Sequence, residues 1–158
     1  MKKILIALDY DPLAQKIAEV GYSLAKDMNA KVILLHVISD ASSYSSLNYL
    51  PIMGFDNFNN ADVIETVITD EFLKKTAQEY LDKSKEHLGD ETIETIVKDG
   101  DFGNSILEVA AEKNVDVIVM GSHRRTGLDK ILMGSSIAEK VLHHSSIPLF
   151  IVPTGEKK

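Results

Sequence analysis

Short, continuous apolar runs are the feature that most restricts the fold of this chain. Residues 3–8 and 31–38 form such runs, and 115–120 and 147–153 form two more. Strands without polar alternation are typical of a sheet that is covered on both faces, and such sheets are mostly parallel. Because parallel strands need long crossover connections, we expect a helix between successive strands.

The segments between these runs carry helical spacing. After Asp11-Pro12, which is typical of a helix start, apolar residues recur at Leu13, Ile17, Val20, Leu24 and Met28, up to a break at Asn29-Ala30. Further helices are predicted over 62–88 (with Gly89-Asp90 as the stop), 105–113 and 135–144, and a weakly alternating strand at the sheet edge over 92–97. This order predicts an α/β fold: an open, five-stranded parallel sheet with helices on both faces.

Residues 39–62 interrupt this pattern. They are rich in serine and asparagine and also contain Tyr44, Tyr49 and Phe55. We interpret them as a long irregular connection, either a partner surface or a lid. Because the α/β pattern resumes afterwards, the segment is not a domain linker, and we expect one domain over 1–154 followed by a polar tail, 155–158.

Composition excludes several classes of function. The net charge of −7 argues against binding to nucleic acid or to anionic membranes through the whole surface. The absence of cysteine excludes disulfides, thiolate metal sites and a cysteine nucleophile. No apolar stretch approaches the roughly 18 residues of a membrane span, and the N-terminal run is too short for a signal peptide and ends at the acid Asp9. We therefore expect a cytoplasmic protein.

The segment 115–136 points most directly to a ligand. An apolar strand ends at Gly121, a basic loop follows, and Gly134-Ser135-Ser136 opens the next helix. Glycine-rich turns and helix N-termini both present unpaired backbone N–H groups to anions. Residues 121–144 carry a net charge of +2, whereas the rest of the chain carries −9. A bound phosphate fits this pattern, although an ordinary solvated loop with a simple turn at Gly121 and a serine cap also fits.

The ends of the first two strands supply further candidates. Ligands of open parallel sheets bind beyond the carboxyl ends of strands, where the strand order reverses. If the first and fourth strands are neighbours, Asp9 and Gly121 face each other across that crevice. Asp9 then either accepts hydrogen bonds from a ribose or an adenine edge, or caps the helix that follows it. Val37 either offers its backbone to a base or belongs to the core.

Two kinds of catalytic site are not supported by the sequence. His123, His143 and His144 do not have the spacing of metal ligands, and no acidic cluster accompanies them. The chain also lacks a G-x-S-x-G nucleophile elbow, so hydrolysis by a serine triad has no support.

Taken together, these segments resemble the universal stress protein family over nearly the whole chain. The resemblance rests on residues 3–9, 34–37, 116–123, 126–128, 131–135 and 147–153. It implies a sheet of order 3-2-1-4-5, like that of the adenine nucleotide alpha hydrolases. It also implies a homodimer that pairs through the final strand, 148–153.

Nucleotide-binding members of this family carry G-x2-G-x9-G-[ST] after the fourth strand and hold ATP with it. Here Gly121, Gly134 and Ser135 match that pattern, but Arg124 replaces its second glycine. The arginine side chain either blocks the approach of the loop to phosphate, or Arg124 or Arg125 grips the phosphate oxygens directly. Gly127 offers a way to absorb a shifted loop.

The resemblance therefore implies a stress-response protein that binds ATP, with or without Mg²⁺, and hydrolyses it slowly if at all. It places Asp9 and Val37 at adenine and ribose. The full expected binding set is Asp9, Val37, Met120, Gly121, His123, Arg124, Arg125, Gly127, Gly134, Ser135 and Ser136. We assign no catalytic residue and no metal ligand.

Three other functions are weighed against this one. Arg124 and the irregular 39–62 segment also fit a family member that has lost nucleotide and acts as a dimeric interaction module. A phospho-accepting receiver domain is imitated by Asp9, Asp11 and Asp99, but the last strand lacks the lysine that a receiver requires. A dinucleotide-binding fold is not supported, because residues 8–12 contain no glycine fingerprint.

Overall fold

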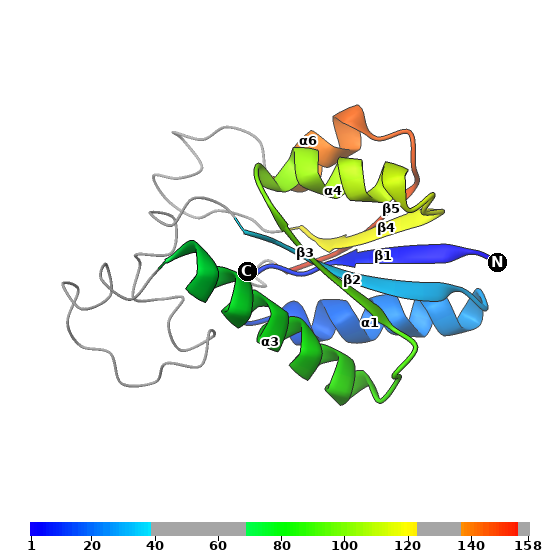
Figure 1. Cartoon of the computed structure of the whole chain (residues 1–158). Helices are drawn as coiled ribbons and strands as arrows, with labels where there is room; N and C mark the ends of the chain where they lie inside the picture. The colour runs from blue at the N-terminus through cyan, green and yellow to red at the C-terminus, as the bar shows by residue number, and fades with distance from the viewer. Residues whose placement is uncertain (39–68, 123–136, 155–158) are drawn as a thin grey trace.

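The computed structural model describes residues 1–38, 69–122 and 137–154. Its centre is a five-stranded sheet in which every pairing is parallel and the order is β3-β2-β1-β4-β5 (Figure 1). The strands are β1 (Lys3–Ala7), β2 (Lys31–Ile38), β3 (Glu94–Asp99), β4 (Val117–Gly121) and β5 (Leu149–Val152). The predicted parallel sheet and its order are confirmed.

Helices cover both faces of the sheet. α1 (Ala14–Asp27) and α3 (Asp70–Leu88) lie on one face, and α4 (Phe102–Glu112) and α6 (Ile137–His144) lie on the other (Figure 1). A hydrophobic cluster lies on each side of the sheet, and alternate residues of β1 point into one or the other. Ile4 and Ile6 pack in the cluster that includes α1, whereas Leu5 packs with α4 and α6. All three are fully buried, which is why the strand carries no polar alternation.

The strand order reverses beside β1. From β1 the chain proceeds outward to β2 and β3, and it then crosses to the opposite side for β4 and β5. Leu5 lies opposite both Ile33 of β2 and Ile118 of β4. The carboxyl ends of these three strands therefore meet at one edge of the sheet, which is where open α/β sheets bind ligands.

The helix boundaries differ from those predicted. α1 begins at Ala14 rather than at 11–12, because the Asp11 carboxylate accepts the Leu13 amide at 2.7 Å and holds a turn there. α4 begins at Phe102 rather than 105, because Asp101 accepts the amide of Asn104 and caps the helix. α3 begins at Asp70 rather than at 62, because Thr69 has extended backbone and its Oγ1 accepts the Phe72 amide at 3.2 Å. The predicted start of the last helix, at 135, lies outside the described residues.

The strand boundaries are set by pairing. β3 extends to Asp99 instead of ending at 97, because its register with β2 continues to the pair Ile38 and Asp99. It lies at an edge, as predicted. β5 is shorter than the predicted 147–153 and occupies 149–152, the four residues that pair with β4. The predicted helix stops are confirmed, with left-handed backbone at Asn29 (φ 51°) and Gly89 (φ 67°).

Truncation of Leu5 tests the two-faced burial of β1. Leu5→Ala removes a fully buried side chain from the central strand, and we expect it to lower the free energy of unfolding by about 2–5 kcal/mol. The same change at Leu13, which is 38% exposed, is the matched control and should cost under about 1 kcal/mol. Chemical denaturation measures both, and equal losses would contradict the assignment of Leu5 to the core.

Candidate functional site

A pocket lies at the carboxyl ends of β1, β2 and β4. It encloses about 520 Å³ of empty space, counting the part that is open to solvent. Its wall consists of Ala7, Leu8, Asp9, Asp11, Ile17, Leu35, Val37, Phe102, Ile106, Met120, Gly121, Ile137 and Thr154. The wall thus includes four of the predicted site residues, namely Asp9, Val37, Met120 and Gly121.

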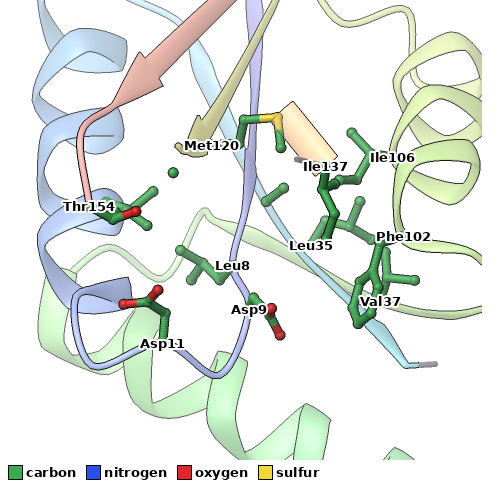
Figure 2. Close-up of a pocket in the computed structure, with 13 residues that line it drawn as sticks. Leu8, Asp9, Asp11, Leu35, Val37, Phe102, Ile106, Met120, Ile137 and Thr154 are labelled. Carbon is green, nitrogen blue, oxygen red and sulfur yellow. The ribbon is translucent and has the colours of Figure 1, made fainter. Parts of the chain in front are cut away.

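The pocket wall has an acidic side and an apolar side. Figure 2 shows Asp9 and Asp11 on the loop after β1, whereas Val37, Phe102 and Ile106 form an apolar side away from them. Among the described residues of the wall, these two carboxylates are the only charged groups. Such a wall fits a flat, apolar group that carries hydrogen-bond donors on one side, and it does not by itself fit a phosphate.

The Asp9 side chain accepts a hydrogen bond from the backbone of the next residue. Pairing with β2 extends one residue beyond β1, where the Leu8 amide donates to Leu35 O at 2.8 Å. The next residue is Asp9, whose Oδ1 accepts the Tyr10 amide at 2.7 Å. The bonds at the start of α1 involve Asp11 instead, so the alternative role of Asp9 as the helix cap is wrong. No described residue donates to its second oxygen, Oδ2.

An aromatic cluster of Tyr10, His36 and Tyr80 lies behind Asp9. The ring centroids of Tyr10 and His36 are 4.4 Å apart, and those of Tyr10 and Tyr80 are 5.0 Å apart. His36 is fully buried, with Nδ1 2.8 Å from Leu8 O. Because a carbonyl only accepts, Nδ1 carries the proton and donates it. The Tyr80 hydroxyl donates to Asp9 O at 2.9 Å.

Burial determines the protonation of both ring systems. It lowers the pKa of His36, outweighing the opposing effects of the Leu8 carbonyl and the Asp9 charge. It also raises the pKa of Tyr80 far above its usual range, with the Asp9 and Asp11 carboxylates adding to the shift. Tyr80 therefore remains a hydrogen-bond donor at physiological pH, and His36 remains neutral.

Gly121 is closely packed by side chains of the protein itself. A Cβ at this position would lie 2.7 Å from Ile17 Cδ1 and 2.9 Å from Thr154 Cγ2. Both of these residues form part of the pocket wall. This crowding favours glycine without any ligand, and the predicted approach of phosphate to its backbone stays a prediction.

The described residues on either side of 123–136 lie at or next to the pocket wall. Before it, the Ser122 amide donates to Val152 O at 2.9 Å, and the Thr154 amide donates to Ser122 Oγ at 3.0 Å. After it, Ile137 is itself a wall residue. The remaining predicted site residues, which are His123, Arg124, Arg125, Gly127, Gly134, Ser135 and Ser136, lie outside the described residues, as does the 39–62 segment.

Several wall and supporting residues were missed in the sequence. Phe102 and Thr154 follow the carboxyl ends of β3 and β5, so their positions after strands were an available signal. His36 gave only a weak one, as a polar residue inside an apolar run. Tyr80 gave none, because it lies on α3 and reaches Asp9 across 71 positions of sequence.

The receiver-domain alternative is not favoured by the geometry. Asp99 ends the edge strand β3, with β2 between it and β1, and its carboxylate pairs with Lys74 at 3.2 Å on the surface. Within the described residues, no group of three or more histidine, aspartate or glutamate side chains is placed to hold a metal ion. No helix in this part of the chain is long and apolar enough to cross a membrane.

The sheet order, the two helical layers and the pocket at the point of reversal define a doubly wound α/β protein. Comparison with known proteins places it more closely. The family model of the universal stress protein family matches residues 1–153, and the chain belongs to this family. Universal stress protein MJ0531 of Methanocaldococcus jannaschii is 32% identical to it over 99% of this chain and 85% of the relative. YxiE of Bacillus subtilis is 31% identical over 95% and 97%.

Solved structures confirm the fold. The structure of the hypothetical protein MJ0577 aligns with a TM-score of 0.68 at 25% identity, covering 99% of this chain and 98% of that one. A universal stress protein in complex with cAMP aligns with a TM-score of 0.64 at 17% identity over 98% of each chain. The universal stress protein of Archaeoglobus fulgidus in complex with dAMP gives 0.59 at 15% identity over 96% and 97%.

The buried imidazole predicts a pH dependence of stability. Because the folded state lowers the pKa of His36 below its ordinary value of 6.5, the unfolded state takes up the proton first as the pH falls. The contribution of neutral His36 is therefore complete above about pH 6.5 and is lost on acidification towards the lower folded-state pKa. His36→Asn should lack this component. Denaturation from pH 8 to 5 measures it, and parallel pH profiles of the two proteins would contradict it.

Proposed function

We propose that this protein binds an adenine nucleotide, with ATP as the expected ligand, and that the pocket holds the base and ribose. The observation that carries the proposal is Asp9, whose Oδ2 has no donor among the described residues and which lies opposite an apolar wall. The adenine amino group and the ribose hydroxyls are donors that such a carboxylate accepts. Val37 and Met120 supply apolar surface for the base.

Two solved members of the same fold support this choice of ligand. One is a complex with cAMP and the other a complex with dAMP. Both ligands contain adenine and a single phosphate. The proposal assigns these two parts of the nucleotide to different parts of the site. The described wall receives the base and sugar, and the phosphates extend towards the 123–136 segment.

That segment supplies the positive charge that the described wall lacks. Arg124, Arg125 and Lys130 belong to it, with Asp129 as its only acid, and the described residues that flank it, Ser122 and Ile137, lie next to and in the wall. We infer that Arg124 or Arg125 contacts phosphate oxygens in place of the missing second glycine. The proposed role is regulatory, with nucleotide binding itself as the stress-response signal and hydrolysis slow or absent.

Titration calorimetry with ATP and Mg²⁺ tests the binding. We expect saturable heat for the unmodified protein and an affinity about 10- to 100-fold lower for Asp9→Asn, because hydrogen bonds to a charged group contribute about 1.5–3 kcal/mol. Asp27→Asn is the matched control, since Asp27 is exposed in the last turn of α1, away from the pocket. It should leave the affinity unchanged.

Gly134→Val should abolish binding if this glycine contacts phosphate. A thermal shift assay at millimolar ATP provides a second readout for all three variants. Neither heat nor a shift for the unmodified protein would overturn the nucleotide proposal. That result would favour the non-nucleotide interaction module as the function.

We also propose a homodimer that forms through residues 148–153. β5 pairs only with β4 in the described sheet, and its Phe150 and Ile151 are 40% and 37% exposed. A strand edge with free backbone groups and large exposed apolar side chains is a surface that another copy can cover. The same surface supports the interaction-module alternative, because it does not depend on nucleotide.

Phe150→Asp tests this interface, since a carboxylate on β5 cannot be buried against a second copy without a partner. We expect a dimer for the unmodified protein and a monomer for the variant in sedimentation equilibrium at micromolar concentration. Phe150→Leu keeps an apolar side chain and should remain dimeric. A monomeric unmodified protein, or a dimeric Phe150→Asp variant, would show that this edge is not the interface.

A further inference from the structure

We propose that His36 and Tyr80 are positioning residues of the pocket, which orient Asp9 towards the ligand by holding two consecutive carbonyl groups of the loop after β1. Neither side chain is a wall residue of the pocket. The inference rests on the proposed function in one respect, namely that Asp9 contacts the nucleotide. The orientation of Asp9 itself can be tested without nucleotide.

The loop needs such support because its regular pairing ends just before Asp9. The last sheet-like bond is that from the Leu8 amide to Leu35 O. Beyond it, Leu8 O accepts from His36 Nδ1 at 2.8 Å, and Asp9 O accepts from the Tyr80 hydroxyl at 2.9 Å and from the Asp11 amide at 2.8 Å. Two side chains from β2 and α3 thus act together with a local backbone turn where the sheet bonds have ended.

The direction of the Asp9 carboxylate follows from that backbone. Its Oδ1 accepts the amide of Tyr10, the next residue, so the carboxylate keeps its orientation only while the peptide between Asp9 and Tyr10 keeps its own. The carbonyl of that peptide accepts from the Tyr80 hydroxyl, in addition to the Asp11 amide. Rotation of this peptide would therefore also redirect Oδ2, the oxygen proposed to accept from the ligand.

His36 also connects the end of β1, next to Asp9, with the strand that carries Val37 on the apolar side of the pocket. Successive side chains of a strand point to opposite faces, and the next residue on β2 is Val37, a wall residue. His36 faces the α1 and α3 side, where it touches Tyr10 and Tyr80. Its bond to Leu8 O thereby ties the end of β1 to the strand that carries Val37, and so sets the spacing of the two residues proposed to contact base and ribose.

Packing alone does not account for a histidine at this position. His36 is fully buried, and its Nε2 has no hydrogen-bond partner among the described residues. A buried polar atom without a partner is unfavourable, and an apolar residue of similar size would avoid it. The imidazole supplies a hydrogen-bond donor to Leu8 O, which an apolar side chain cannot do.

Tyr80→Phe is the sharpest test, because it removes one hydroxyl and keeps the ring. We expect its affinity for ATP to fall about 3- to 10-fold, the range of a single hydrogen bond between uncharged groups. Tyr22→Phe is the matched control: Tyr22 also donates its hydroxyl across the fold, to Asp90 at 3.0 Å, but neither residue belongs to the pocket wall. It should leave the affinity unchanged even if it lowers stability.

A double-variant cycle separates positioning from general damage. If Tyr80 acts through Asp9, Tyr80→Phe should have no further effect on affinity once Asp9→Asn is present. A similar loss in both backgrounds would overturn the proposal, because it would indicate a purely structural role. His36→Asn, which retains a donor near the position of Nδ1, should bind ATP more tightly than His36→Leu, and equal affinities would contradict the role of the donor.

Amide hydrogen exchange decides the matter without nucleotide. Tyr80→Phe should accelerate exchange at the Tyr10 amide, which donates to Asp9 Oδ1, whereas Tyr22→Phe should not. If the unmodified protein binds no ATP but this difference is found, the proposed ligand is wrong and the orienting contact stands. If the Tyr10 amide exchanges alike in both variants, the positioning proposal is overturned whatever the affinities.

Discussion

The pairing of β1 on both of its edges is the constraint on which the rest of the structure depends. β1 lies between β2 and β4 and is buried on both faces, with Ile4, Leu5 and Ile6 fully inaccessible to solvent. This position makes its carboxyl end the point where the strand order reverses. The wall residues of the pocket come from β1, β2 and β4, from the segments after β1 and β5, and from α1, α4 and α6. Burial of one apolar strand thus determines where the pocket lies.

A buried strand must also end, and the way β1 ends links packing to function. The backbone groups after the last sheet bond need new partners, since water has little access to them. In this protein the partners include two side chains, with His36 donating to Leu8 O and Tyr80 to Asp9 O, and the Asp11 amide also donates to Asp9 O. Satisfying the carbonyls in this way leaves the Asp9 side chain at the pocket wall instead of at the helix start, where Asp11 takes that place. The same contacts that complete the core therefore support the site.

The sequence predicted the sheet, its two helical layers and four wall residues, because apolar periodicity and strand ends are local signals. Boundaries were less well predicted where a single contact decides them, as with the Asp101 cap that starts α4 at Phe102. Contacts between distant residues left no local signal. Tyr80 meets Asp9, and Thr154 meets Gly121, only because the fold brings α3 and the end of β5 to the pocket. Gly121 was singled out for a turn or a ligand, and the side chains of Ile17 and Thr154 that crowd it gave no signal in the sequence.

The distribution of charge around the proposed site favours one orientation of a bound nucleotide. The described wall carries two carboxylates, whereas residues 121–144 carry the net positive charge of a chain that is otherwise acidic. Phosphates close to Asp9 and Asp11 would be repelled, and phosphates close to Arg124 and Arg125 would be attracted, so the proposed binding mode has one favoured orientation. In that mode the base and sugar would meet the Asp9 carboxylate, and the anionic end would meet the basic segment. Specificity for the nucleoside and affinity for the phosphates would then come from different parts of the chain.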